Sequence, residues 1–357
     1  MRLVNDRQQL NSGSGAVRRN LQFDARRLAQ WMQANVGGFH GDLAVEQFKG
    51  GQSNPTYKLE SASGTYVLRR KPPGETVAGA HAVDREARVQ RALAGSAVPV
   101  CRVFGLCTDP EVIGSWFYIM EFVAGRIFWD ASFPGVPREE RPRYFDEMNR
   151  IMAALHSLEL APLQLADFGR AGNYFDRQIR RWTRQYRADP EAGSNRHLEA
   201  LIDWLPENIP CDAAVSLTHG DFRVDNLIFH PTEPRVLAVL DWELATIGHP
   251  IADFTNHSLM YRIRPTTIAG LEGLDLAELN IPSEERYLDM YCRRRGHGRI
   301  ESLNFYYAFN MFRLAVIIHG IKARVIRGTA SSAHGDRFAE SLPLLAERAW
   351  SIAQSSA

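Results

Sequence analysis

The alternation of hydrophobic and polar positions divides the chain into a strand-rich first third and a mostly helical remainder. Two helices are expected in the first third: one capped by Asp24, with Leu28 and Met32 on its apolar side, and one over residues 83–93. Short segments with period-two alternation, bounded by turn residues, predict strands at residues 43–48, 56–59, 65–69, 102–107 and 116–122. This part of the chain therefore predicts a five-stranded antiparallel sheet with an inserted helix.

Helical spacing prevails after residue 138, and residues 216–241 form the one clear strand-like interruption. A small sheet-rich lobe followed by a larger helical lobe is an α+β arrangement. We expect a flexible tail at residues 1–22, an N-terminal lobe at residues 23–123 and a C-terminal helical lobe at residues 124–357.

Composition and charge narrow the class of protein. The 357 residues are 45% hydrophobic and 23% charged, which is typical of a globular chain. The formal charge of +1, from 42 Lys plus Arg and 41 Asp plus Glu, lacks the basic excess of a nucleic-acid binder. The sequence shows neither a signal-peptide core nor an uninterrupted apolar span, and its four cysteines lack the close spacing of a metal site. We expect a cytoplasmic protein with no nucleic-acid or membrane partner.

Residues 217–243 carry the most informative pattern in the chain. Strand-like residues 227–230 and 236–240 flank a turn at residues 231–234, which predicts a hairpin. Because the turn folds the hairpin back, Asn226 and Asp241 are expected at its open end, with Asp221 on the loop just before it.

These three side chains suit phosphoryl transfer. A carboxylate must accept or orient the proton of the attacking hydroxyl, and oxygen ligands must hold magnesium against the phosphates. Asp221 fits the first role, and Asn226 and Asp241 fit the second. A kinase catalytic loop has the same order: an Asp, an Asn five residues later, a hairpin and a magnesium-binding Asp. The plainer alternative is that Asp and Asn are turn-capping residues.

The segment His219-Gly220-Asp221, with Asn226 and then Asp241-Trp242-Glu243, resembles the aminoglycoside phosphotransferase and choline kinase superfamily, relatives of protein kinases. Residues 248–254 also resemble that family's pattern, in which Asp253 would brace the loop. The resemblance extends over residues 23–355. It implies a protein-kinase-like two-lobed fold and a small-molecule kinase that uses ATP and Mg²⁺.

The resemblance also implies where the nucleotide would bind. Its phosphates would lie near a glycine-containing loop between the first two strands, through Gly50, Gly51, Ser53 and Asn54. Adenine would contact main-chain groups near Glu121 and Val123, in the segment between the lobes. Without the family, the loop would be interpreted as a hairpin turn and the segment as a core strand.

A basic residue is expected beside the phosphates as well. Arg69 occupies the position where related kinases have the phosphate-binding lysine, and a guanidinium can bind phosphate bidentately. Lys71 is the rival candidate. Glu86 would pair with the cation and hold it in place, the alternative being a solvated helix residue.

Two departures from protein kinases bear on regulation. His-Gly-Asp replaces His-Arg-Asp, and Asp-Trp-Glu replaces Asp-Phe-Gly. Both indicate an enzyme that is not controlled by phosphorylation of an activation loop. The sequence contains no Gly-x4-Gly-Lys-Ser/Thr motif, which argues against a P-loop enzyme.

The acceptor is predicted from local charge. An aminoglycoside pocket should be acidic, yet residues 170–200 carry seven arginines against four acids. One helical face is expected to present Arg177, Arg180, Arg184 and Arg187, with Trp182 and Tyr186 interleaved. A solvated basic face is the plainer interpretation.

A second resemblance gives the acceptor more detail. Residues 66–74 resemble the kinase-like domain associated with acyl-CoA dehydrogenases, which implies a hydroxyacyl-CoA or a similar anionic acceptor. The alternatives are an aminoglycoside or amino-alcohol kinase, and a non-catalytic nucleotide-binding scaffold.

Overall fold

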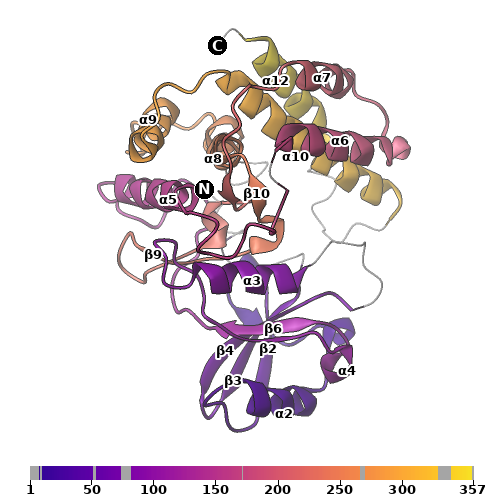
Figure 1. Cartoon of the computed structure of the whole chain (residues 1–357), viewed down its shortest axis with the longest axis vertical. Helices are drawn as coiled ribbons and strands as arrows, with labels where there is room; N and C mark the ends of the chain where they lie inside the picture. Colours follow the sequence, from indigo (N-terminus) through magenta and orange to yellow (C-terminus); the bar gives the residue numbers. More distant parts are fainter. Residues whose placement is uncertain are drawn as a thin grey trace. The chain divides into compact units, whose positions relative to one another are not determined.

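The computed structural model describes residue 8 and residues 10–50, 54–73, 82–170, 172–265, 270–328 and 339–355. The chain forms two compact units, which Figure 1 colours along the sequence. Unit 1 comprises Met1–Ala154, Ala161–Leu165 and Arg223–Ala245. Unit 2 comprises Leu155–Leu160, Ala166–Phe222 and Thr246–Ala357.

Unit 1 is built on a six-stranded antiparallel sheet of order β1-β2-β3-β4-β6-β5. The five predicted strands are all present, and their bounds are β2 (Ala44–Phe48), β3 (Thr56–Ser61), β4 (Gly64–Arg70), β5 (Val103–Cys107) and β6 (Phe117–Glu121). The sixth strand was not predicted. It is β1 (Ser14–Gly15), which pairs with Phe48 and Gln47 of β2.

The described residues of the expected tail therefore contain regular structure. After β1 comes the short 3-10 helix η1 (Arg19–Leu21), and the Tyr57 hydroxyl donates to the Leu21 carbonyl at 2.9 Å. A two-residue polar strand carries too little alternation to be recognised from sequence. Its pairing depends instead on the exposed edge that β2 offers.

Helices cover both faces of this sheet, because successive strand residues point to opposite sides. In α2 (Ala25–Asn35), Leu28 and Met32 pack in a cluster with Leu68 of β4. In α3 (Val83–Leu93), Val83 packs in another cluster with Val67, the residue before Leu68. Figure 1 shows α2 and α3 on the two sides of the strands. The Asp24 carboxylate accepts from the first-turn amides of α2, as the predicted cap requires.

The predicted hairpin is present as β8 (Leu227–Phe229) and β9 (Val236–Val239), between the 3-10 helices η3 (Val224–Asn226) and η4 (Trp242–Leu244). This hairpin belongs to unit 1. The Phe229 main chain exchanges two hydrogen bonds of 2.8 Å with Arg126, and the Val239 amide donates to the Pro99 carbonyl at 2.8 Å. Unit 1 is consequently larger than the predicted N-terminal lobe of residues 23–123, because it also holds most of α5 (Arg141–His156). The short helix α4 (Pro110–Ile113) lies within the predicted lobe.

Unit 2 is mostly helical, and helix α10 (Leu303–Ile326) is its centre. Phe309, Phe312 and Val316 of α10 are buried, and the helix packs against four others: α6 (Tyr174–Arg187), α7 (Arg196–Glu207), α8 (Pro250–Ser258) and α12 (Leu342–Gln354). The unit also contains α9 (Glu284–Arg295), η2 (Pro190–Ala192), η5 (Leu259–Arg262) and a two-stranded sheet of β7 (Ser216–Thr218) and β10 (Thr246–Gly248). Among the described helices, none has the length and hydropathy needed to span a membrane.

Helix α8 is buried almost throughout, and its His257 side chain bridges two neighbouring elements. The Nδ1 atom lies 2.9 Å from the Phe222 carbonyl, and Nε2 lies 2.7 Å from the Tyr287 hydroxyl. The geometry suits a neutral imidazole that donates at Nδ1 and accepts at Nε2. Burial lowers the pKa of His257 to about 4.

We expect a Gly125→Ala substitution to destabilise unit 1. An added Cβ would lie 2.4 Å from both Ile228 Cγ2 and the Phe229 carbonyl oxygen, so the hairpin would have to move. Overpacking of this kind costs about 1–3 kcal/mol. Urea unfolding should show that loss for Gly125→Ala and little change for Gly135→Ala, where the added Cβ meets no atom within 4 Å. Equal unfolding midpoints for the two variants would contradict the described packing.

We expect His257 to make the protein less stable as the pH falls below about 6.5. The folded pKa lies below the unfolded value, so the unfolded chain binds a proton that the folded chain cannot accommodate until about pH 4. Between pH 7 and 4.5 this linkage removes about 2–3 kcal/mol. The unfolding free energy of His257→Gln, measured in urea at each pH, should therefore fall less steeply than that of the wild type. Parallel pH profiles would show that His257 titrates normally.

Candidate active site

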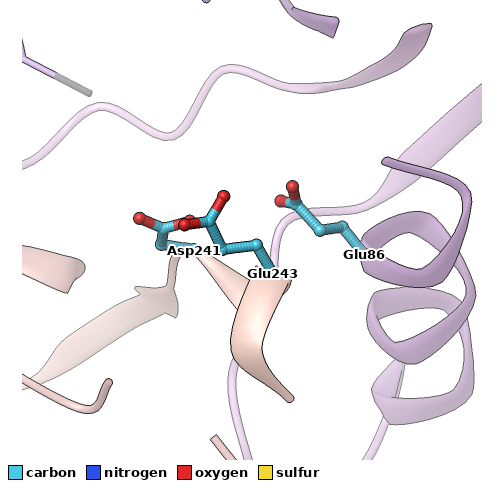
Figure 2. Close-up of side chains that lie close together, drawn as sticks. All are labelled: Glu86, Asp241 and Glu243. Atoms are coloured by element: carbon cyan, nitrogen blue, oxygen red, sulfur yellow. The ribbon is translucent and has the colours of Figure 1, made fainter. Parts of the chain in front are cut away.

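Unit 1 gathers three carboxylates, Glu86, Asp241 and Glu243, which we call the carboxylate cluster. One oxygen from each lies within 4.8 Å of the others. Figure 2 shows Glu86 reaching from α3 toward Asp241 and Glu243, which come from the turn after β9. Three acids at this spacing repel one another unless a cation lies among them.

Arg69 of β4 supplies one such cation. Its Nε lies 2.8 Å from Glu86 Oε2, its Nη2 pairs with Asp241, and the same nitrogen lies 4.0 Å from Glu243 Oε2. The side chain is only 9% exposed. Burial disfavours the charged guanidinium, but Glu86 and Asp241 outweigh it and raise the pKa of Arg69 above its ordinary value. Arg69 thus stays charged, and the predicted Arg69–Glu86 pair is present.

Asn54 also joins the cluster. Its side-chain nitrogen donates to Glu86 Oε1 at 2.7 Å and to Glu243 Oε2 at 3.3 Å. Tyr118 donates to the other oxygen of Glu86 at 3.2 Å. Burial raises the pKa of Glu86, while Arg69 acts in the opposite direction. Glu86 is consequently a fixed, fully buried partner of Arg69 and Asn54 rather than the solvated helix residue of the alternative interpretation.

The hairpin brings Asn226 and Asp241 to its same open end. Leu227 is paired with Val239, and the Leu240 amide donates to the Asn226 carbonyl at 2.8 Å. Asp241 adopts φ 63° and ψ 60°, a left-handed conformation that is uncommon for a residue other than glycine. Such conformations cost about 1–3 kcal/mol and often occur at functional sites.

This donor set fits a magnesium ion. Mg²⁺ prefers carboxylate and amide oxygens, and one arginine cannot neutralise three ionised carboxylates. Asp241 and Asn226 are the predicted ligands. Glu243 was missed as a candidate, although it stands two residues after Asp241 in the quoted Asp-Trp-Glu triplet. Only the η4 turn shows that both side chains reach the same place.

The structure describes only some of the other residues that were predicted to bind the nucleotide. Gly50 follows β2, and an added Cβ there would lie 3.0 Å from the Trp129 ring. Gly51 and Ser53 lie outside the described residues. The Glu121 amide already donates to the Arg102 carbonyl at 2.8 Å, so an amide contact to adenine would fall to Val123.

Lys71, the rival of Arg69, is directed elsewhere. Its ammonium lies 4.3 Å from the centre of the Trp116 ring. Arg69, by contrast, lies inside the carboxylate cluster. The geometry therefore favours Arg69 as the phosphate-binding cation, and the role itself stays a prediction.

In unit 2, the loop His219-Gly220-Asp221 follows β7 and is held by one buried carboxylate. Asp253 accepts from the His219 amide at 2.7 Å and from the Gly220 amide at 2.8 Å. His156 Nε2 lies 3.2 Å from the same carboxylate. Burial alone would raise the pKa of Asp253, but hydrogen bonds from His156 and the loop lower it. The bracing role expected for Asp253 is confirmed.

The loop is fixed on its other side as well. The Gly220 carbonyl accepts from Arg313 at 2.8 Å and from Asn256 at 3.4 Å, and Gly220 has φ +80°, which suits glycine. The Asp221 amide donates to His219 Nδ1 at 3.2 Å, and the Asp221 residue is half-buried. Because Asp221 belongs to unit 2 while Asn226 and Asp241 belong to unit 1, the convergence of all three stays a prediction.

The basic face of α6 differs from the expected one. Arg180, Arg184 and Arg187 are exposed, whereas Arg177 is half-buried and donates to the Arg170 carbonyl at 2.6 Å. Trp182 and Tyr186 are buried on the other side of the helix. Tyr186 packs on His319 of α10, with ring centres 4.6 Å apart. The aromatic residues are thus core residues and are not interleaved in the basic surface.

Comparison with known proteins assigns the chain to a family. The sequence model of the phosphotransferase enzyme family matches residues 44–297. A crystal structure from Ralstonia eutropha, described only provisionally as an aminoglycoside phosphotransferase, shares 50% identity with a TM-score of 0.85, covering 93% of this chain and 99% of that one. Aminoglycoside phosphotransferase APH(4)-Ia, in complex with ADP and hygromycin B, shares the fold at 15% identity and TM-score 0.59, covering 92% and 99%.

Longer curated proteins match over part of their length. Acyl-CoA dehydrogenase family member 11 of Homo sapiens is 40% identical over 91% of this chain and 42% of its own length. Acyl-CoA dehydrogenase family member 10 of Mus musculus is 41% identical over 94% of this chain and 32% of its own length. The chain thus spans less than half of these relatives. The expected α+β kinase-like fold is confirmed, and the chain belongs to the phosphotransferase enzyme family, with the enzyme class of a small-molecule kinase.

Proposed function

We propose that this protein transfers the γ-phosphoryl group of ATP to a hydroxyl of a small anionic acceptor, of which a hydroxyacyl-CoA is the leading candidate. The observation that carries the proposal is the carboxylate cluster around buried Arg69. A buried cation among three acids suits a site that must bind both phosphate oxygens and a divalent ion. The ADP and AMP-PNP complexes of APH(4)-Ia support ATP as the donor.

Asp221 is proposed as the catalytic residue. Its carboxylate would accept the proton of the acceptor hydroxyl as the new O–P bond forms and the bond to ADP breaks. The adjoining loop donates two amide hydrogen bonds to Asp253 and accepts hydrogen bonds from Arg313 and Asn256. These contacts hold the loop, so little reorganisation is required when the acceptor binds.

Asn226 and Asp241 are proposed as the magnesium ligands, with Glu243 as a further candidate beside them. Bound magnesium would supply positive charge against the phosphate oxygens, where negative charge accumulates. Arg69 would bind phosphate oxygens directly, while Glu86 and Asn54 keep the Arg69 side chain in place. Gly50, Gly51, Ser53, Glu121 and Val123 complete the proposed nucleotide contacts.

The anionic acceptor is supported by residues 170–200, which carry seven arginines against four acids, and by the similarity to proteins named acyl-CoA dehydrogenase family members. Acids would be expected around a polycationic aminoglycoside. The aminoglycoside or amino-alcohol alternative would gain support if only cationic acceptors were phosphorylated. A non-catalytic scaffold would bind ATP without turnover of any acceptor.

We expect Asp221→Asn to lower kcat by about 10²–10⁴-fold, because a positioned proton acceptor contributes that much. The Kd for ATP should stay within about twofold of the wild type, since no ATP contact is assigned to Asp221. ATP turnover and calorimetric ATP binding measure the two quantities. Asp203→Asn, which changes an exposed acid of α7, is the control and should behave as the wild type. Full activity of Asp221→Asn would remove this residue from the mechanism.

We expect Asp241→Asn to raise the Mg²⁺ concentration for half-maximal activity by at least about 10-fold, because the substitution removes a charged oxygen ligand. If Glu243 also reaches the ion, Glu243→Gln should raise it in the same direction. Titrations of activity with MgCl₂ at fixed ATP test this expectation, with Glu207→Gln, at an exposed position of α7, as the control. An unchanged Mg²⁺ requirement in Asp241→Asn would exclude this residue as a ligand.

A further inference from the structure

Two arginines of unit 2 lie on the same aromatic ring. The Arg181 guanidinium of α6 lies 5.3 Å from the centre of the Trp182 ring, and that of Arg313 of α10 lies 5.6 Å from it. Trp182 is buried, so its ring is a fixed surface for both guanidinium groups.

Neither guanidinium is neutralised by the protein. Within the part of the chain that the structure describes, no carboxylate lies within 4.0 Å of the guanidinium of Arg181 or Arg313. The neighbouring Tyr174 stays uncharged, because burial raises its pKa to about 12. Arg181 is an exposed residue, and desolvation by its neighbours and the charge of Arg313 lower its pKa, as expected where a second cation is close. Two cations on one aromatic ring, with no carboxylate close to either among the described residues, favour the binding of an anion.

The position of Arg313 relates this pair to the catalytic loop. One of its nitrogens donates to the Gly220 carbonyl at 2.8 Å, and Gly220 directly precedes Asp221. The other donors of Arg313, and the whole guanidinium of Arg181, have no partner among the described residues. A guanidinium fork matches the oxygens of a phosphate or a carboxylate.

We propose that Arg181 and Arg313 form an anion-binding pair, backed by Trp182, that holds a phosphate or carboxylate group of the acceptor close to Asp221. This inference rests on the proposed function and adds to it the residues that select the acceptor. Arg181 is the specificity residue, and Arg313 has two tasks, because it also positions the catalytic loop.

The test compares three acceptors with the same hydroxyacyl chain. One is the coenzyme A thioester, which carries phosphates; one is the free hydroxy acid, which carries a carboxylate; and one is the uncharged pantetheine thioester. Arg181→Gln should raise the KM of the acceptor that supplies the anion by at least about 10-fold, because one of the two charge-assisted contacts is lost. The KM values for the pantetheine thioester and for ATP should stay within about twofold. The phosphate and carboxylate sources are distinguished by which charged acceptor loses affinity.

Matched variants separate this effect from general damage. Arg180→Gln removes an exposed charge from the same helix and should leave every KM within about twofold. Arg181→Lys should recover part of the lost affinity, since it restores the charge without the planar fork. An equal rise in KM for charged and uncharged acceptors would overturn the inference, and so would a rise confined to ATP.

A binding measurement keeps the inference independent of turnover. Calorimetric titration with coenzyme A and, separately, with the free hydroxy acid should show weaker binding of one of them by Arg181→Gln. If the wild type binds neither probe, the anion-binding pair is refuted. If the wild type turns over none of the three acceptors, the proposed acceptor class is refuted, while the binding titrations still test the pair.

Discussion

A single buried guanidinium, that of Arg69, is the interaction on which the carboxylate cluster depends. It draws together Glu86 from α3 and Asp241 from the turn after β9, two segments that are far apart in the sequence. Without this cation, the acids would repel one another at their observed spacing, and burial would raise the pKa of Glu86 further. The cluster therefore fixes the end of the hairpin against the β4–α3 layer of unit 1.

Charge balance in this cluster also supports the proposal that it is a binding site rather than a structural ion pair alone. Breaking a buried pair by removing one partner costs several kcal/mol, about 3–5, so Arg69 and Glu86 stabilise unit 1 whatever else they bind. Asp241 and Glu243 are less buried, with side chains 24% and 19% exposed. Glu86 is thus a structural partner of Arg69, whereas Asp241 and Glu243 are groups that a cation can still reach.

Unit 2 is also organised around a buried charge, but here the charge is negative. Its loop His219-Gly220-Asp221 is organised around the buried anion Asp253, which main-chain amides and His156 stabilise. Across the loop, Arg313 donates to Gly220 and leaves its remaining donors for a ligand. The carboxylate cluster of unit 1 therefore has more acids than cations, whereas Arg181 and Arg313 of unit 2 have no carboxylate within 4.0 Å among the described residues. This division suits a metal with its nucleotide on the one hand and an anionic acceptor on the other.

The sequence by itself determined the local elements and the spacing of the polar groups. The alternation of hydrophobic and polar residues predicted five strands of the main sheet, and the position of Asp24 before an apolar helix predicted the cap. The hairpin pattern predicted that Asn226 and Asp241 lie at the same end. Those features depend on residues that are close in the chain, so periodicity and turn chemistry are sufficient.

Tertiary structure alone decided the pairing of β1, the burial of Trp182 and Tyr186, and the entry of Glu243 into the cluster. A polar strand needs an open edge, an aromatic residue on a basic helix needs a neighbour to cover it, and a carboxylate needs a distant arginine. Such partners are set by long-range packing, and no local pattern in the sequence records them.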